Sequence, residues 1–198
     1  MKIKFFIASY FIFISFAFAS EATLINEVEH YLNNIHTLST YFKQLTPLDK
    51  KKSSSGKLYI SKPGMLRFDY LAPKKLTIIL RDENVMYHDH ELQEVSYVSQ
   101  SNYFFKLLSE KNIKLADDAK KISLINNEVH LHIEKIIDNV NTNIIMIFSY
   151  NPMNLKEVRV NKNDLEEYFL YFTNTEYNLN FDKKFFSLQA PQFYSTPY

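Results

Sequence analysis

Hydrophobic and polar positions alternate with a period of two along most of this chain, as they do in half-buried β-strands. In the clearest example, Leu66, Phe68 and Tyr70 alternate with Arg67 and Asp69, so the apolar set should face the interior. A Pro-Gly pair before this segment predicts a tight β-hairpin. The predicted strands span 39–46, 57–62, 65–71, 76–80, 84–88, 91–98, 122–125, 129–136, 143–150, 155–161 and 168–175.

Two segments break the alternation and predict helices. Residues 20–36 repeat apolar positions every three or four residues, with Ser20 as the N-cap. Residues 101–109 hold a compact apolar cluster, typical of a short helix with a cap at 101 or 102. The apolar positions of the two helices include Leu24, Val28, Ile35, Phe104, Phe105 and Leu108.

The succession of short strands separated by Asn, Asp and Pro turns indicates an antiparallel sheet, meander or barrel. Strands and helices do not alternate, which argues against a parallel doubly wound sheet. Residues 50–55 are predicted to form a solvated loop, and residues 185–188 a last short strand or a pinning segment. We expect one domain over residues 20–198.

The first nineteen residues read as an export signal. Lys2 and Lys4 precede an uncharged apolar run of about 14 residues, shorter than the roughly 20 that span a bilayer. Ala17-Phe18-Ala19 matches the small-x-small cleavage pattern, so we expect removal of residues 1–19 and a periplasmic protein. Loss of the two lysines changes the net charge from +1 to −1, which gives no support for nucleic-acid binding.

The composition of potentially catalytic residues argues against an enzyme. The chain has no Cys and only two Gly, which excludes disulfides, thiol chemistry and a glycine-rich phosphate loop. His88-x-His90 and His130-x-His132 could pair on a strand face as metal ligands, but we expect solvated histidines and no metal site. We expect no cofactor. The 14 Tyr and 17 Phe favour pleated surfaces and apolar cavities.

The order of these features resembles the LolA family of periplasmic outer-membrane lipoprotein carriers. The hairpin from Gly56 to Tyr70, followed by Pro73, resembles the family's "G-x-hydrophobic-x-hydrophobic-x-[RK]-P-G-x-hydrophobic-R-[FW]-x-Y-x-x-P". The other segments that resemble the family are Tyr31 to Leu38, Tyr41 to Gln44, Ile78 to Tyr87 with Asp89 and Gln93, and Phe181 to Leu188.

This resemblance implies an incomplete antiparallel β-barrel, mainly β with α, covered by a helical lid. It implies a non-enzymatic, monomeric chaperone that shelters the acyl chains of lipoproteins. The implied partners are acylated lipoproteins, a lipoprotein-releasing ABC transporter of the inner membrane and, where present, an outer-membrane receptor. An alternative on the same fold is a periplasmic sensor module that binds lipids or lipoproteins.

The candidate residues fall into two sets on either side of the expected cavity. The cargo-binding set is Leu66, Phe68, Tyr70, Ile78, Leu80 and Tyr87, with Val85 or Met86. The lid set is Lys62, Leu24, Val28, Ile35, Phe104, Phe105 and Leu108. We also expect Leu66→Glu to leave the chain folded but to impair cargo transfer.

Two positions depart from the family pattern. Lys62 stands where the family commonly has an arginine that contacts the lid, and a lysine lacks the guanidinium fork for several bonds. Asp82-Glu83-Asn84 replaces the usual Asp-Gly turn, so we expect a turn other than type I′ there.

Overall fold

The structure is a computed structural model that describes residues 20–46, 53–99, 103–137, 139–162 and 166–189. Eleven strands form one antiparallel sheet in the order β6-β5-β4-β3-β2-β1-β11-β10-β9-β8-β7. Their bounds are β1 Thr37–Leu45, β2 Ser53–Ser61, β3 Met65–Ala72, β4 Leu76–Arg81, β5 Asn84–Asp89, β6 Glu94–Ser99, β7 Ala119–Ile125, β8 Glu128–Ile137, β9 Val140–Ser149, β10 Asn154–Lys162 and β11 Glu166–Tyr177.

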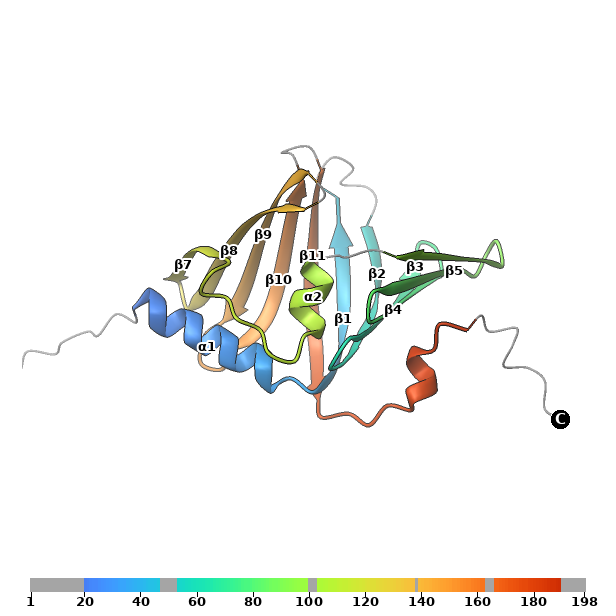
Figure 1. Ribbon diagram of the computed structural model, residues 1–198, viewed down its shortest axis with the longest axis horizontal. Helices are drawn as coiled ribbons and strands as arrows, with labels where there is room; N and C mark the ends of the chain where they lie inside the picture. Colours follow the sequence, from blue (N-terminus) through green and yellow to red (C-terminus); the bar gives the residue numbers. More distant parts are fainter. Residues whose placement is uncertain (1–19, 47–52, 100–102, 138, 163–165, 190–198) are drawn as a thin grey trace, which may run out of the picture.

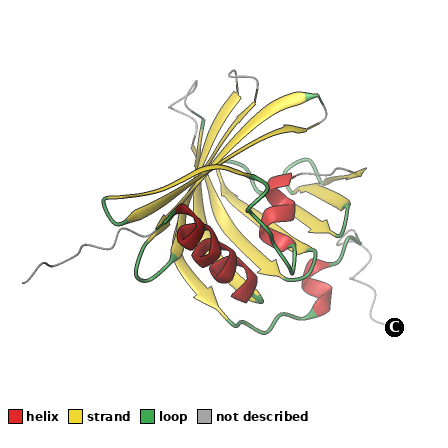
Figure 2. Ribbon diagram, turned by 60° about the vertical axis from the view of Figure 1, so that its left-hand side comes forward, coloured by secondary structure: helices red, strands yellow, loops and turns green. Residues whose placement is uncertain are grey.

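The sheet curves strongly but does not close, because β6 and β7 lie at opposite ends of the strand order. Helix α1 (Glu21–Asn34) runs across the concave face beside β7 to β10, and α2 (Tyr103–Ser109) lies near the middle of that face (Figures 1 and 2). The predicted fold class, an incomplete antiparallel barrel covered by helices, is therefore confirmed. Among the described helices, none has the length and apolar character to cross a membrane.

Helix α1 forms where the sequence predicts it, and the cap is the expected one. The Ser20 side chain accepts a hydrogen bond from the Thr23 backbone N–H at 3.2 Å, which satisfies one of the free donors of the first turn. Leu24, Val28 and Leu32 share one face and are buried against the sheet. The helix is thus held by packing of one apolar stripe.

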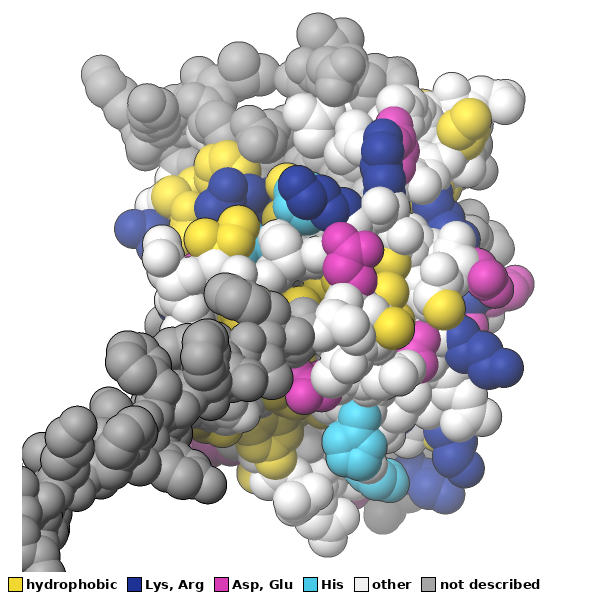
Figure 3. Space-filling model, turned by 90° about the vertical axis from the view of Figure 1, so that its left-hand side faces the viewer, with side chains coloured by type: hydrophobic (Ala, Val, Ile, Leu, Met, Phe, Trp, Pro, Cys, Tyr) yellow, Lys and Arg dark blue, Asp and Glu magenta, His cyan; other side chains and the backbone are white. Residues whose placement is uncertain are grey.

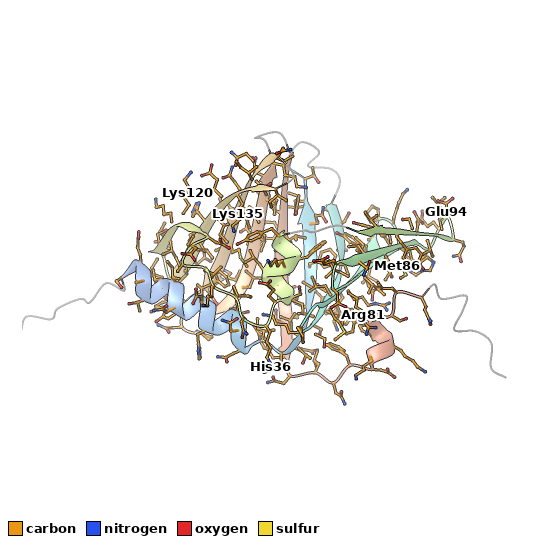
Figure 4. All side chains as sticks on the ribbon, in the orientation of Figure 1. His36, Arg81, Met86, Glu94, Lys120 and Lys135 are labelled. Atoms are coloured by element: carbon orange, nitrogen blue, oxygen red, sulfur yellow. The ribbon has the colours of Figure 1, made fainter. Side chains whose placement is uncertain are left out.

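The interior is divided between the two faces of the sheet. The main core lies between the concave face and the helices, and includes β7 to β11 as well as the hairpin. A second, smaller cluster lies on the convex face, where Ile79 and Met86 pack against Phe186 of the 3₁₀ helix η2 (Lys183–Phe186). Figure 4 places Met86 on the side of the molecule where η2 lies.

The outward-facing residues of β3 contact the C-terminal segment on the convex face. Arg67 donates to both carboxylate oxygens of Asp69 and, at 3.0 Å, to the Phe185 carbonyl. Its guanidinium also lies 4.3 Å from the centre of the Phe185 ring. The outward set of the hairpin therefore holds the C-terminal segment to the sheet and is not simply solvated.

One free edge of the sheet carries exposed apolar side chains among charges. Leu124 and Ile125 of β7 and Ile136 of β8 are exposed, and Figure 3 shows hydrophobic side chains on this face next to Lys or Arg. Lys120 of β7 pairs with Glu134 of β8. Charged side chains beside an open edge oppose pairing with another strand.

Several predicted boundaries differ from the structure. Residues 53–55 belong to β2 and not to a loop, because they pair with the end of β1. Residues 91–93 form a turn before β6, and the tail at 183–186 is a 3₁₀ helix. The α2 cap expected at 101 or 102 lies outside the described residues, as does the export signal expected at 1–19.

The turn between β4 and β5 confirms the expectation drawn from its missing glycine. Arg81 pairs with Asn84, so Asp82 and Glu83 form a two-residue loop. Asp82 has a φ of 57°, whereas Glu83 is not among the residues with positive φ. A type I′ turn needs positive φ at both central residues, so this turn is of another type.

Candidate functional site: an apolar sheet under two helices

The cargo-binding candidates all lie on the concave face or against its core. Leu66, Phe68 and Leu80 are buried, and register places Leu66 opposite Leu80 and Phe68 opposite Ile78. Tyr70, Ile78 and Tyr87 are partly buried against the same core. Of the two alternatives on β5, Val85 joins this core while Met86 lies in the convex cluster.

The lid candidates meet the sheet candidates across this core. Leu24, Val28 and Ile35 of the α1 region and Phe104 and Leu108 of α2 are buried in it. The Phe105 ring is partly buried, and its centre lies 5.5 Å from that of Phe68. We refer to α1, α2 and the loop 110–118 together as the lid.

Beneath α1, the space between lid and sheet is nearly filled. The cavity lined by Leu32, Ile35, Leu58, Leu108 and Phe172 has a volume of about 20 Å³, room for about one water molecule. A ligand of more than one or two atoms can therefore enter this cavity only if the lid moves or the lining side chains rearrange. The structure corresponds to a closed lid.

Lys62 contacts the lid directly. It follows β2, and its Nζ donates to the Leu32 carbonyl near the C-terminus of α1 at 2.7 Å. The last carbonyls of a helix carry partial negative charge and lack partners within the helix. Burial lowers the pKa of Lys62 to about 8, although the Glu110 carboxylate acts in the opposite direction. A partly buried ammonium thus makes one bond to the helix end.

The same hairpin also contacts the second helix. The Gly64 N–H donates to the Ser109 carbonyl at the end of α2 at 2.9 Å, and the Gly64 carbonyl accepts from the Asp82 N–H at 2.8 Å. Gly64 has a φ of 75°, a conformation that glycine adopts at little cost. Lys62 and Gly64 therefore bond the hairpin to α1 and to α2 respectively.

The parts of the lid are bonded to one another. The Asn33 side chain of α1 donates to the Ile113 carbonyl at 3.0 Å and accepts from the Ile113 N–H at 2.7 Å. The Leu115 N–H donates to the Glu29 carboxylate of α1 at 2.5 Å. Because these bonds join α1 to the loop after α2, we expect the lid to move as one unit.

Asp118 and Lys135 bind the N-terminal end of α2 through Tyr103. The Tyr103 hydroxyl donates to Asp118, which also pairs with Lys135 of β8 at 2.5 Å. Burial alone would raise the pKa of Asp118, but hydrogen bonds from Lys135 and Tyr103 lower it overall. Figure 4 shows Lys135 on the α2 side of the β7–β10 half. The lid is thus joined to the β7–β10 half by an ion pair and to the hairpin by the Lys62 hydrogen bond.

His88 of β5 is more buried than expected, whereas His90, in the turn after β5, is partly exposed. His88 is 6% exposed, so the prediction of a solvated histidine is wrong for this residue. The cause is the C-terminal segment, which covers this part of the convex face. Thr77 donates its one hydroxyl proton to Asp69, so His90 Nε2, 2.9 Å from Thr77 Oγ1, acts as the donor there. Within the described ranges, no three His, Asp or Glu residues group as metal ligands.

Sequence reasoning missed the polar contacts that position the lid. Asn33 and Glu29 were unremarkable helix positions, because their partners at 113 and 115 lie about 80 residues away. The aromatic packing of Phe181 and Phe185 on Tyr59 was also missed. The Phe-rich run near the C-terminus was the available signal for that contact.

Comparison with known proteins agrees with the lidded, open sheet. The family model for the outer membrane lipoprotein carrier protein LolA matches residues 33–189. The chain therefore belongs to the LolA family.

Curated relatives are distant and match to different extents. An uncharacterized protein of Rickettsia prowazekii is 27% identical over 91% of this chain and 84% of its own length. The outer-membrane lipoprotein carrier protein of Pseudomonas aeruginosa PAO1 is 28% identical over 55% of this chain, and that of Helicobacter pylori 26% over 60%. These two alignments span 52% and 65% of the carrier proteins.

Solved structures share the fold at very low identity. A conserved protein from Thermus thermophilus has a TM-score of 0.53 at 7% identity, covering 83% of this chain and 91% of its own. A domain from Vibrio parahaemolyticus, described as an outer membrane lipoprotein-sorting domain, has a TM-score of 0.53 at 8% identity, covering 82% and 94%. At such identities the likeness establishes the fold alone.

Proposed function

We propose that this protein is a periplasmic carrier that shelters the acyl chains of lipoproteins. It accepts them from a lipoprotein-releasing ABC transporter in the inner membrane and delivers them to the outer membrane, through a receptor where one exists. The observation that carries the proposal is the apolar concave face of an open sheet, covered by two helices that pack on it through apolar side chains. The family membership of the chain supports it.

The energetics of the lid fit such a carrier. Each CH₂ of an acyl chain is worth about 0.8 kcal/mol when it leaves water, so free acyl chains do not cross an aqueous compartment. Lid opening alone exposes Leu24, Val28 and Phe104 together with the sheet face they cover. Acyl chains that replace these side chains on the sheet offset that exposure, so loading exchanges one apolar contact for another.

The cargo surface extends from the hairpin to β5. Leu66 and Phe68 form its buried centre, and Tyr70 lies at its side, where its hydroxyl donates to Gln44 Oε1 at 2.8 Å. Burial raises the pKa of Tyr70 to about 12, so this hydroxyl stays neutral. Ile78 and Tyr87 continue the same surface. A wall of aromatic and aliphatic side chains suits chains that lack polar groups.

The test is release of lipoproteins from membranes. Residues 20–198, incubated with spheroplasts, should bring lipoproteins into the supernatant as a soluble one-to-one complex, compared with an incubation without protein. Lipopeptide binding without any release would instead favour a sensor module on the same fold. A folded protein that neither binds lipopeptides nor releases lipoproteins would exclude both functions.

Lys62 predicts a pH dependence of lid closure. In the closed state its pKa is about 8, whereas a solvated lysine has a pKa near 10.5. Between these values the open state binds more protons, so raising the pH through this window should favour the closed lid. In Lys62→Met this dependence should disappear, because residue 62 no longer titrates.

The measurement uses energy transfer between dyes on two introduced cysteines, at the exposed positions Ala22 of α1 and Glu83 of the β4–β5 turn. The native chain has no Cys to interfere. Lys57→Met is the matched control, because Lys57 lies on β2 over the Tyr41 and Tyr59 rings and away from the lid. An unchanged pH dependence in Lys62→Met would contradict the prediction.

A further inference from the structure

A large groove lies along the outer side of α1. Its volume is about 820 Å³, and it is bounded by α1, by the turn between β9 and β10, and by the end of β11. Three tyrosines contribute to it, Tyr31, Tyr150 and Tyr177, together with Met153. The groove is therefore large enough for several residues of a peptide and partly apolar, but its lining is not that of the main core.

The groove has a single negative charge with incomplete hydrogen bonding. Glu27 is the one carboxylate among the lining residues, which include neither Lys nor Arg. Its Oε1 lies 3.5 Å from the Tyr150 hydroxyl, a long contact, while its Oε2 is buried and has no hydrogen-bond partner among the described residues. A buried carboxylate oxygen without a donor is costly. This favours a ligand that brings a cation.

The hydroxyls of Tyr31 and Tyr177 in the groove already have partners. The Tyr31 and Tyr177 hydroxyls lie 2.9 Å apart, Tyr31 accepts from the Leu155 N–H, and Tyr177 donates to Asn154 Oδ1. These bonds fix the two rings as a wall beside the carboxylate. Tyrosine rings attract cations through their faces, so the wall adds to the preference that Glu27 creates.

The groove adjoins the space beneath the lid. Tyr31 and Ile35 line both this groove and the inner cavity between lid and sheet. A second groove of about 380 Å³, between α2 and the β4–β5 turn, shares no lining residue with the inner cavity, but it is lined by Leu80 of the sheet and Phe105 of the lid. A molecule whose acyl chains enter the inner cavity over β1, β2 and β11 can therefore place its polar head in the α1 groove by passing Tyr31 and Ile35.

We propose that this groove holds the polar head of the acylated cargo and that Glu27 binds an ammonium group of that head. The inference rests on the proposed carrier function. Two sources of ammonium share this chemistry: the free α-amine of a diacylated N-terminal cysteine, and a lysine in the residues that follow it. Acyl chains supply affinity beneath the lid, and the Glu27 contact orients the protein part of the cargo outside it.

The test compares three synthetic lipopeptides binding to residues 20–198. The first is a diacylated cysteinyl peptide with a free α-amine and no lysine, the second its N-acetylated form, and the third the N-acetylated form with one lysine. Glu27→Gln keeps an acceptor for Tyr150 but removes the charge. It should weaken whichever ammonium-bearing peptide fits by about tenfold and leave the second peptide unchanged. The first and third peptides identify the source.

Glu21→Gln is the matched control, because it removes the same charge from an exposed position of α1 outside the groove. Equal weakening of all three peptides by Glu27→Gln, or no weakening of any, would overturn the inference while leaving the carrier function standing. Failure of the wild-type protein to bind any of the three peptides would instead count against the carrier function itself.

Discussion

Leu66→Glu is expected to reduce lipoprotein release from spheroplasts at least about tenfold while the variant keeps its sheet. Leu66 is 0% exposed and lies on β3 beneath the lid. An ionised carboxylate there, with no partner, costs several kcal/mol, and the lid can relieve this cost by moving away. The backbone pairing of β3 with Ile60 and Leu80 does not depend on the side chain. The charge then lies on the surface that we propose for the acyl chains.

Circular dichroism and the spheroplast assay together measure this outcome. Leu71→Glu is the matched control, because Leu71 lies on the same strand but is 57% exposed. It should fold and carry lipoproteins as the wild type does. A Leu66→Glu protein that has lost its sheet, or one that releases lipoproteins normally, would show that this position does not act through the cargo surface.

The strands could be predicted from the sequence where only one face of the sheet is buried, because apolar and polar residues then alternate. In β3 the alternation identified Leu66, Phe68 and Tyr70 as inward, and the structure buries them wholly or partly. In α1 the apolar stripe and the Ser20 cap were both readable, because helix signals are local. These elements are specified by residues within a few positions of one another.

The convex cluster could not be read in the same way. Ile79 and Met86 break the alternation of β4 and β5, since both faces of these strands are covered. Which segment covers the second face depends on packing of Phe186, about 100 residues further along the chain. Likewise Asn33 binds Ile113 across 80 positions. Local periodicity carries no information about such contacts.

The residues of the candidate site could be predicted from the sequence, but whether they form an open cavity or a closed, packed core could not. The sequence identifies apolar side chains on the sheet and on the helices, yet both sets are equally consistent with a filled core. In the structure they pack against each other, with about 20 Å³ left beneath α1 and a groove of about 380 Å³ between α2 and the β4–β5 turn. Function then depends on how easily this core divides along the boundary between Phe68 on the sheet and Phe105 on the lid.

The largest expected loss of stability comes from Gly56→Ala. A Cβ at this position would lie 2.2 Å from the Asp69 carbonyl oxygen on β3 and 2.8 Å from Cζ of Phe42. Neither can move freely, because the oxygen is backbone and the Phe42 ring packs edge-on against Phe68 and Tyr70. Overpacking of a core usually costs 1–3 kcal/mol. With a backbone clash added, we expect a loss of at least about 3 kcal/mol.

Gly64→Ala is the matched control, because it changes the only other glycine of the chain in the same way. Its nearest neighbour is Oδ1 of Asp82, the end of a side chain that can rotate, at 2.9 Å. The remaining cost is that of a φ of 75° for alanine, about 1–2 kcal/mol. Urea unfolding followed by tyrosine fluorescence measures both variants. Equal losses would contradict this account, since only at Gly56 does the sheet itself oppose a methyl group between β2 and β3.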